Sequence, residues 1–411
     1  MPIALRGLSR DGWMLFVTRF VRLFAYGALS VILVFYLVGL GLTGPQAGLV
    51  LTLTLFGDVV VSLYLTTRAD RLGRRRMLVV GSVLMAAAGL AFASTRNLFF
   101  LILAGTIGVI SPSGNEVGPF LSIEQAALSH IVPATARTDV FAWYTLAGSV
   151  ATATGALFGG SVTQALQGKA FSPVDSYRAV VFLYAGFGIV LAFLFTRLSA
   201  FTEVDAVETG APAPHFLGMA RSQNLVLKLS GLFALDSFGG GFVVQSFAAY
   251  WFYLRFGVEP RTLGAIFFWA NLFAGFSALL ASRLAKRIGL VRTMVFTHLP
   301  SNVLLILVPL MPTLPLAVLV LLLRFSISQM DVPARQSYTM AVVPPEERSA
   351  VGGFTAVART SGAALSPLFA GFLFSRPSLI SAPFFIAGTL KIVYDLLLYI
   401  SFRKLRPPEE R

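Results

Sequence analysis

Two aspartates stand inside long apolar runs of this 411-residue sequence, where a carboxyl group could carry out proton chemistry. Asp58 has Thr54 and Ser62 on its helical face, and Asp236 comes shortly before three consecutive glycines. A carboxyl group among apolar groups holds a proton more readily than one in water, and it can release that proton when water or a cation arrives. The two aspartates therefore predict proton-binding positions. The alternative for each is a static hydrogen bond or ion pair between helices.

Arginines within apolar runs form a second set of candidates. Arg19, Arg22 and Tyr26 repeat at i, i+3 and i+7, which places them on one face of a helix. Such cations can pair with carboxylates or meet an anionic or polar substrate. Long arginine side chains near a helix end can instead extend to a polar boundary, and this is the alternative for Arg19 and Arg22.

A later apolar run combines arginines with an acid. Arg324, Asp331 and Arg335 share one helical face at i, i+7 and i+11, and Arg359 stands in the run that follows. Asp331 and Arg335 also have the i,i+4 spacing of a helical ion pair, so mutual neutralisation is the alternative to a functional role. Arg324 lies deeper and is the candidate for contact with a substrate.

Long apolar helices must position these groups. Hydrophobic residues make up 56% of the chain and charged residues only 12%, which lies outside the range of soluble globular domains. A helix of about 20 apolar residues crosses the hydrocarbon layer of a membrane. Segments of this kind occur at 13–39, 46–66, 77–94, 98–128, 140–165, 177–196, 225–254, 262–282, 292–310, 314–340, 350–374 and 379–402. The sequence thus predicts an all-α polytopic membrane protein with twelve transmembrane helices, the first of them retained and not removed as a signal peptide.

The stretch SPSGNEVGP, residues 111–119, is expected to break the fourth of these helices near Asn115 and Glu116. Irregular backbone at membrane depth is tolerated mainly where it lines a cavity or is buried in protein. Glu116 is therefore predicted to line a central cavity. If the break lies close to the cytoplasmic surface, Glu116 belongs to a gate instead.

Basic residues set the predicted orientation. Lys and Arg are concentrated in alternate connections between the spans, including five arginines in LTTRADRLGRRRML, residues 65–78. The positive-inside rule then places both termini in the cytoplasm. Topology accounts for the formal net charge of +14, and no aromatic residues alternate with a basic patch, so nucleic-acid binding is not predicted.

The sequence lacks the residues that metal binding, nucleotide binding and enzymatic catalysis usually require. There are no cysteines and only three widely separated histidines, so neither disulfides nor a metal site is predicted. The sequence has no phosphate-binding glycine-rich loop with its lysine, which makes an ion gradient the expected source of energy and leaves no cofactor to be expected. We find no nucleophile paired with a base, and an enzyme is not predicted.

An internal repeat divides the chain into two halves. VPATARTDVFAWYTLAGS (132–149) aligns with VPPEERSAVGGFTAVART (343–360) at an offset of 211 residues, and a weaker alignment matches Gly73 with Gly289. Duplicated halves around a midplane site are typical of many transporters. We predict one six-helix half at 1–200, a polar cytoplasmic linker at 201–223, and a second six-helix half at 224–411.

The arginine-rich stretch resembles the loop between helices 2 and 3 of the major facilitator superfamily. That pattern is a glycine, three residues, Asp-Arg, one residue, Gly, one residue and two basic residues. Thr66 replaces the leading glycine, and the pattern is matched by Asp70, Arg71, Gly73, Arg75 and Arg76. The resemblance implies the fold of the superfamily, with these residues in a cytoplasmic gate.

The same resemblance implies that Asp70 reaches, through an arginine, a carboxylate low on the fourth helix. Glu124 is the candidate for that carboxylate. Ion pairs of this kind can break and re-form as two halves move against each other. The alternative is that the arginines of the stretch serve only to set topology.

The segment ATATGALFGG, residues 151–160, resembles a signature of superfamily antiporters in helix 5. Gly155, Gly159 and Gly160 match it, whereas Ala151 and Ala156 replace its first glycine and its proline. Small residues let helices approach closely, so ordinary helix packing is the alternative reading.

The residues and the resemblance together predict a secondary transporter that moves a small organic solute by alternating access. The leading expectation is proton-coupled efflux of a drug, toxic compound or metabolite, with an Arg19–Asp236 pair that opens when Asp236 takes a proton. A proton symporter or facilitator importing an anionic metabolite, with Arg19, Arg22 and Arg324 as charge partners, is the alternative, as is a lipid flippase. The expected setting is a bacterial inner membrane, and the resemblance implies a working monomer.

Overall fold

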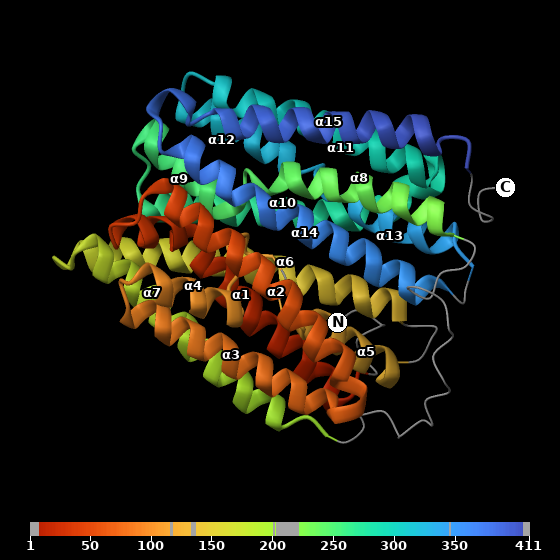
Figure 1. The fold of residues 1–411 in the computed structure, drawn as a ribbon, viewed down its shortest axis with the longest axis horizontal. Helices are drawn as coiled ribbons and strands as arrows, with labels where there is room; N and C mark the ends of the chain where they lie inside the picture. Colours follow the sequence, from red (N-terminus) through yellow and green to blue (C-terminus); the bar gives the residue numbers. More distant parts are fainter. Residues whose placement is uncertain are drawn as a thin grey trace. The chain divides into compact units, whose positions relative to one another are not determined.

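Every regular element that the structure describes is helical (Figure 1). The structure is a computed structural model, and it describes residues 8–115, 118–132, 137–199, 202, 222–344 and 347–405. The α-helices are α1 (Arg10–Gly39), α2 (Gly44–Leu72), α3 (Arg74–Ser94), α4 (Leu98–Ile107), α5 (Phe120–Ile131), α6 (Arg137–Gln167), α7 (Pro173–Thr196), α8 (Gln223–Gly241), α9 (Gln245–Phe256), α10 (Pro260–Ile288), α11 (Leu290–Leu307), α12 (Leu314–Phe325), α13 (Asp331–Ala341), α14 (Arg348–Phe374) and α15 (Ala382–Phe402). Two 3-10 turns, η4 (Val308–Leu310) and η6 (Pro377–Leu379), follow α11 and α14.

The apolar helices account for the predicted transmembrane spans. Within the described part of the chain, ten helical segments are long and apolar enough to cross a membrane, and two shorter apolar helices, α4 and α12, occupy the remaining predicted spans. The prediction of an all-α polytopic membrane protein is confirmed.

Three of the predicted spans consist of two helices each. The span 98–128 contains α4 and α5, the span 225–254 contains α8 and α9, and the span 314–340 contains α12 and α13. The first break includes the SPSG residues that were expected to interrupt the helix, and the second follows the triple glycine at 239–241. The third break, at 326–330, has no glycine or proline, and we did not expect it.

Two glycines make the same kind of turn in the two halves of the repeat. Gly73, between α2 and α3, has φ 101° and ψ 125°, and Gly289, between α10 and α11, has φ 87° and ψ 162°. Residues with a Cβ avoid this region of backbone space, whereas glycine adopts it freely. Each glycine stands immediately before the first residue of the next helix, which agrees with the sequence alignment of Gly73 and Gly289.

Contacts between Cα atoms group the chain into two compact units. Unit 1 comprises Met1–Val207 and Val244–Asn271, and unit 2 comprises Glu208–Val243 and Leu272–Arg411. In unit 1, α1 packs against α6, α7 and α9, and α3 packs against α7; in unit 2, α8 packs against α14 and α15, and α11 packs against α15. Most of the predicted linker, 201–223, lies outside the described residues, and the predicted division into halves stays a prediction.

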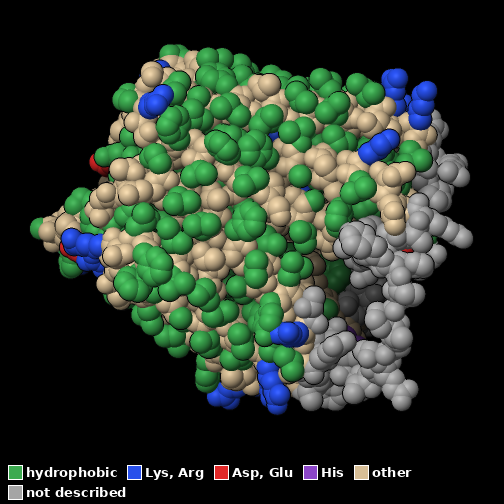
Figure 2. Space-filling model, in the orientation of Figure 1, with side chains coloured by type: hydrophobic (Ala, Val, Ile, Leu, Met, Phe, Trp, Pro, Cys, Tyr) green, Lys and Arg blue, Asp and Glu red, His purple; other side chains and the backbone are tan. Residues whose placement is uncertain are grey.

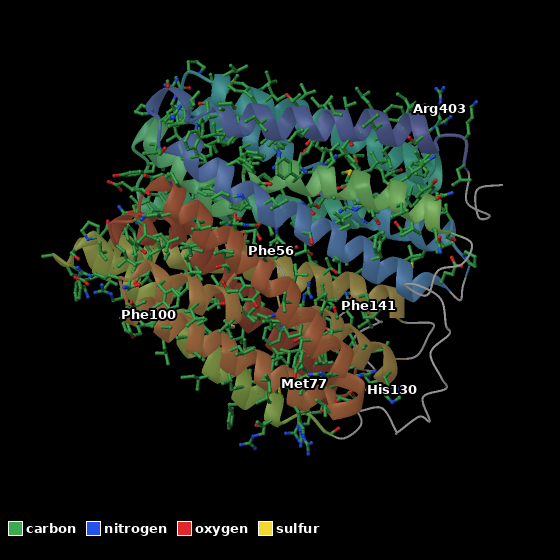
Figure 3. All side chains as sticks on the ribbon, in the orientation of Figure 1. Phe56, Met77, Phe100, His130, Phe141 and Arg403 are labelled. Atoms are coloured by element: carbon green, nitrogen blue, oxygen red, sulfur yellow. The ribbon has the colours of Figure 1, made fainter. Side chains whose placement is uncertain are left out.

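Apolar side chains cover the outer surfaces of the helices. Figure 2 shows hydrophobic side chains over much of the face drawn, with Lys and Arg near its edges. Phe56 on α2 and Phe100 on α4, both labelled in Figure 3, are 44% and 55% exposed. Many other large apolar side chains are exposed in the same way. Such a surface would be unfavourable in water and fits contact with lipid.

Candidate functional site

A carboxylate in α5 is the centre of a buried polar network in unit 1. Glu124 accepts hydrogen bonds from both terminal nitrogens of Arg22, at 2.7 and 2.6 Å, and both side chains are fully buried. Thr18 Oγ1 donates to the same carboxylate at 3.0 Å and the Tyr144 hydroxyl donates at 2.5 Å. A bidentate pair with its remaining lone pairs satisfied is the arrangement in which two charges are stable in a low-dielectric interior.

Helix geometry brings these groups to one place. Thr18 and Arg22 are one turn apart on α1, so both face α5. The guanidinium of Arg22 lies 4.7 Å from the ring centroid of Phe120, and that of Arg19 lies 4.3 Å from the ring of Tyr144. Arg19 is 5% exposed and Arg22 is 0% exposed, so neither has the exposed position of an arginine that extends to a membrane boundary. Arg22 instead neutralises Glu124.

Asp58 on α2 holds the irregular segment between α4 and α5. Its Oδ1 accepts a hydrogen bond from the backbone N–H of Gly118 at 2.5 Å and another from Ser62 Oγ at 3.3 Å. Gly118 has φ 81°, a conformation that favours glycine. Asp58 is therefore a backbone anchor in the structure, which favours the static alternative over proton transport for this residue.

A second buried charge network lies in unit 2. Asp236 on α8 pairs with Lys391 Nζ at 2.6 Å through one carboxylate oxygen and with Arg335 Nη1 at 3.2 Å through the other. Arg335 also pairs with Asp331 at 3.1 Å, which is the predicted i,i+4 contact on α13. Counted over the whole residue, backbone included, Asp236, Asp331 and Arg335 are each no more than 5% exposed. Asp236 is thus an ionised acid held between two cations from two other helices.

A histidine extends this network toward a third acid. His298 Nδ1 on α11 lies 2.8 Å from Asp395 Oδ1 on α15, and His298 Nε2 lies 3.7 Å from Asp236 Oδ1. Asn302, one turn from His298, donates to Asp395 Oδ2 at 2.9 Å. Asp395 is fully buried, so its two contacts replace the water that a carboxylate normally binds.

Close helix packing allows Lys391 to reach Asp236. A Cβ added to Gly239 on α8 would lie 3.2 Å from both the backbone oxygen of Ala387 and the Cγ of Lys391 on α15. A Cβ on Gly240 would lie 3.5 Å from the Lys391 Nζ. The glycines that follow Asp236 therefore keep α8 near α15 at the level of the ion pair.

The remaining cavity candidates are buried to different degrees. Tyr26 is fully buried and stacks on Tyr184, with ring centroids 6.2 Å apart. Arg324 lies over Phe325, and the Nε atoms of Arg324 and Arg359 have no hydrogen-bond partner among the described residues. The predicted Arg19–Asp236 pair would join the two units, and it stays a prediction.

The predicted gate can be described only in part. The side chains of Asp70 and Arg71, and Glu116 as a whole, lie outside the described residues. Arg75 Nη1 donates to the backbone oxygen of Leu198 at 3.2 Å, next to the end of α7. The arginine that pairs with Glu124 is Arg22. The expected link from Asp70 to this network stays a prediction.

The glycines of the helix 5 signature face neighbouring backbones within unit 1. A Cβ on Gly155 or Gly159 would collide with the backbone of α1, at Phe24 and Ala28 respectively. A Cβ on Gly160 would collide with the backbone at Pro260. These positions fit the helix-packing role expected for small residues.

Several residues of the two networks, Lys391, Asp395, His298, Tyr144 and Thr18, were missed in the sequence. Lys391 and Asp395 are one turn apart in the last span, and the rule applied to Asp58 and Asp236 would have found them. His298 was set aside because the three histidines are far apart in sequence. Tyr144 had no sequence signal, because its role depends only on where its hydroxyl meets Glu124. Across the described residues, no group of His, Asp or Glu is arranged to hold a metal ion.

The apolar helices of the described residues and the ion pairs buried among them define a polytopic membrane protein, and comparison with known proteins identifies its family. The family model described as Major Facilitator Superfamily matches residues 15–327 and 229–411. The chain belongs to this superfamily.

Individual relatives support the same assignment. The chain is 33% identical to an uncharacterized membrane protein of Saccharomyces cerevisiae over 96% of this chain and 94% of that protein. It is 28% identical to the quinolone resistance protein NorA of Staphylococcus aureus, over 25% of this chain and 27% of NorA. Two solved structures are similar in fold: a bacterial homolog of the human lysosomal transporter Spinster (TM-score 0.70, 15% identity, 95% and 94% coverage) and the nucleoside transporter NupG (TM-score 0.71, 13% identity, 96% and 100% coverage).

Proposed function

We propose that this protein exports a small organic solute in exchange for protons. The observation that carries the proposal is Asp236, a buried acid within a membrane span that pairs with Lys391 and Arg335. An acid in this position exists either ionised and paired or protonated and released, and a membrane carrier can couple these two states to two conformations. The Glu124–Arg22 pair supports the same view. Its two charges neutralise each other, which leaves Asp236 as the acid that we expect to exchange a proton.

The partial similarity to NorA supports the direction of transport. NorA is named for resistance to quinolones, and the matched segment covers a quarter of this chain. The glycines of the antiporter-like signature point the same way. We therefore place drugs, toxic compounds or metabolites of low molecular weight first among the solutes, moved without chemical change.

Accumulation of dyes in efflux-deficient cells tests the proposal. Cells expressing the wild type, Asp58→Asn or Asp236→Asn at matched levels would be loaded with ethidium and a panel of other dyes, with and without a protonophore. We expect the wild type to lower the accumulation of at least one dye, the protonophore to abolish this effect, and Asp236→Asn to abolish it as well. Unchanged or increased accumulation for every dye would contradict export.

Import of an anionic metabolite is the second candidate function. It is favoured by Arg324 and Arg359, whose Nε atoms are buried in unit 2 with no hydrogen-bond partner among the described residues. Carboxylates and phosphates are the usual partners of such guanidinium groups. Uptake of labelled organic anions by the same cells separates this candidate from export, and loss of uptake in Arg324→Gln would support it.

The proposed setting is a bacterial inner membrane, with both termini in the cytoplasm and a monomer as the working unit. The excess of Lys and Arg in alternate connections supports this orientation. Localisation of the tagged protein in cells of the organism that carries the gene tests this setting.

A further inference from the structure

One imidazole ring in unit 2 faces a carboxylate at each of its two nitrogens. His298 Nδ1 lies 2.8 Å from Asp395 Oδ1, and Nε2 lies 3.7 Å from Asp236 Oδ1. The side chains come from α11, α15 and α8, and their exposed fractions are 7%, 0% and 7%. The mechanism outlined above uses Asp236 but leaves His298 and Asp395 without a role.

The number of protons decides what the ring can do. An ionised carboxylate only accepts hydrogen bonds, so the 2.8 Å contact with Asp395 requires a proton on His298 Nδ1. A neutral imidazole has no second N–H, and Nε2 then directs a lone pair at Asp236. The 3.7 Å separation is longer than a hydrogen bond by less than about 1 Å. One further proton, on the ring or on Asp236, together with a closer approach of Nε2 and Oδ1, would make a hydrogen bond.

The charges in direct contact favour that added proton. The ion-pair network contains the acids Asp236, Asp331 and Asp395 and the cations Lys391 and Arg335. With a neutral imidazole these five side chains carry one net negative charge. A buried network is more stable when its charges balance, and one proton on the ring balances them.

Other groups on the helices packed around the ring complete its surroundings. Tyr394 on α15 meets the His298 ring edge-on, with centroids 5.9 Å apart. Arg324 on α12 and Arg359 on α14 bring two further positive charges into unit 2, and neither forms an ion pair with a described residue. These two arginines oppose a proton on His298, so occupancy of the ring depends on where they lie in each conformation.

We propose that His298, held by Asp395, is a proton relay that loads Asp236. The proposal rests on the proton-coupled transport proposed above and assigns its coupling site. In the transfer, the Nε2–H bond of the imidazolium breaks and an O–H bond forms at Asp236 Oδ1. The ring returns to its neutral form with the proton on Nδ1, and the charge of Asp236 changes from −1 to 0. Neutral Asp236 no longer holds Lys391, which frees that cation for the next step of the cycle.

Asp395 and Asn302 are positioning residues in this relay. Asn302 Nδ2 donates to Asp395 Oδ2 at 2.9 Å and so fixes the carboxylate that accepts from His298 Nδ1. A fixed Nδ1–H leaves Nε2 as the nitrogen that exchanges protons. This second-partner arrangement is the usual way in which proteins select a histidine tautomer.

Nitrogen NMR of the histidine side chains tests the relay without any substrate. The chain has three histidines, and the full-length protein labelled with ¹⁵N-histidine would be studied in lipid nanodiscs from pH 5 to pH 9. His298→Gln assigns the signal, and the exposed His130 at the end of α5 (Figure 3) serves as an internal reference. We expect His298 to change between a neutral ring protonated on Nδ1 and an imidazolium within this range.

The variant Asp395→Asn separates a relay from a merely structural contact. We expect it to move the midpoint of the His298 transition by about one pH unit or more, because the charge in contact with Nδ1 is removed. Asp11→Asn is the matched control, since Asp11 is a buried carboxylate of unit 1 that accepts a hydrogen bond from the Ser199 N–H at 3.1 Å. A His298 ring that stays neutral throughout, or a midpoint that Asp395→Asn does not move, would overturn the proposal.

A transport measurement then links the relay to function. In proteoliposomes we expect His298→Gln to lower ethidium transport driven by a pH gradient at least tenfold and to keep ethidium exchange without a gradient within twofold of the wild type. Equal loss of both activities would contradict a coupling role. If the wild type shows no gradient-driven transport, the proposed function fails, and the NMR titration still decides whether the relay exists.

Discussion

One residue of each buried pair has the same place in the repeat, and the two residues carry opposite charges. The repeat offset of 211 residues aligns Glu124 with Arg335, and Glu124 pairs with Arg22 as Arg335 pairs with Asp236. The carboxylate is on α5 in unit 1 and on α8 in unit 2. The first pair is bidentate and fully buried, whereas Asp236 shares its charge among several partners. We therefore expect the first pair to stabilise the protein and the second to change partners during transport.

Removing one member of the fixed pair should destabilise the protein. Glu124→Gln leaves Arg22 buried without a counter-charge, and the expected loss of unfolding free energy is about 3 to 5 kcal/mol. Thermal unfolding in detergent would measure it. The exposed Glu259, which accepts a hydrogen bond from Gln164, provides the control Glu259→Gln, expected to change stability by about 0.5 kcal/mol or less.

The double variant with Arg22→Leu and Glu124→Leu refines this prediction. It removes both charges at once, so we expect its loss of stability to be smaller than the sum of the two single losses. Additive losses would show that Arg22 and Glu124 do not depend on each other.

The two aspartates should respond differently to removal of charge. Asp58→Asn keeps an oxygen that can accept from the Gly118 N–H, so we expect protonophore-sensitive dye export to remain. Asp236→Asn can no longer alternate between an ionised and a protonated form, and we expect export to be lost. Dye accumulation at matched expression measures both. Loss of coupling in Asp58→Asn together with its retention in Asp236→Asn would reverse the assignment.

At the scale of elements, the broken helices position the networks. Glu124 comes just after the break between α4 and α5, and Asp331 begins α13 after the break between α12 and α13. Backbone groups at a break need partners inside the protein, and Asp58 supplies one of them to Gly118. The helix breaks therefore help to position the buried charged residues.

Replacing the glycine at the first break should strain this element. Gly118→Ala places a Cβ on a residue with φ 81°, and we expect a loss of about 1 to 2 kcal/mol in unfolding free energy. Gly186→Ala on α7 is the matched control, because it is helical with open space around it and should be neutral or stabilising by about 0.5 to 1 kcal/mol. Thermal unfolding of the two variants measures the difference. Equal effects would show that backbone conformation at Gly118 carries no cost.

At the scale of the whole molecule, orientation in the membrane can be tested directly. The chain has no cysteine, so a single introduced cysteine is the only thiol. Lys169, between α6 and α7, and Lys404, after α15, are exposed lysines on connections of predicted opposite sides. We expect a membrane-impermeant maleimide to label Lys169→Cys in intact cells and Lys404→Cys only after permeabilisation. The opposite pattern would place the C-terminus outside, while Arg403 and Lys404 would then contradict the positive-inside rule.

Local sequence patterns were sufficient for the architecture of this protein. Length and apolarity of a segment depend only on neighbouring residues, and they predicted the spans from α1 to α15. The SPSG stretch indicated the first of the breaks, because backbone freedom is also a local property. The Asp331–Arg335 pair followed from helical spacing for the same reason.

Partners far apart in sequence were decided by the tertiary structure. Glu124 meets Arg22 and Tyr144, and Asp236 meets Lys391, only because packed helices bring them together. Spacing along one helix cannot predict such contacts, since any of several helices could supply the opposite charge. A charged residue within an apolar segment predicts that it has a partner, because burying an unpaired charge costs much free energy. Three-dimensional packing alone decides which residue that partner is.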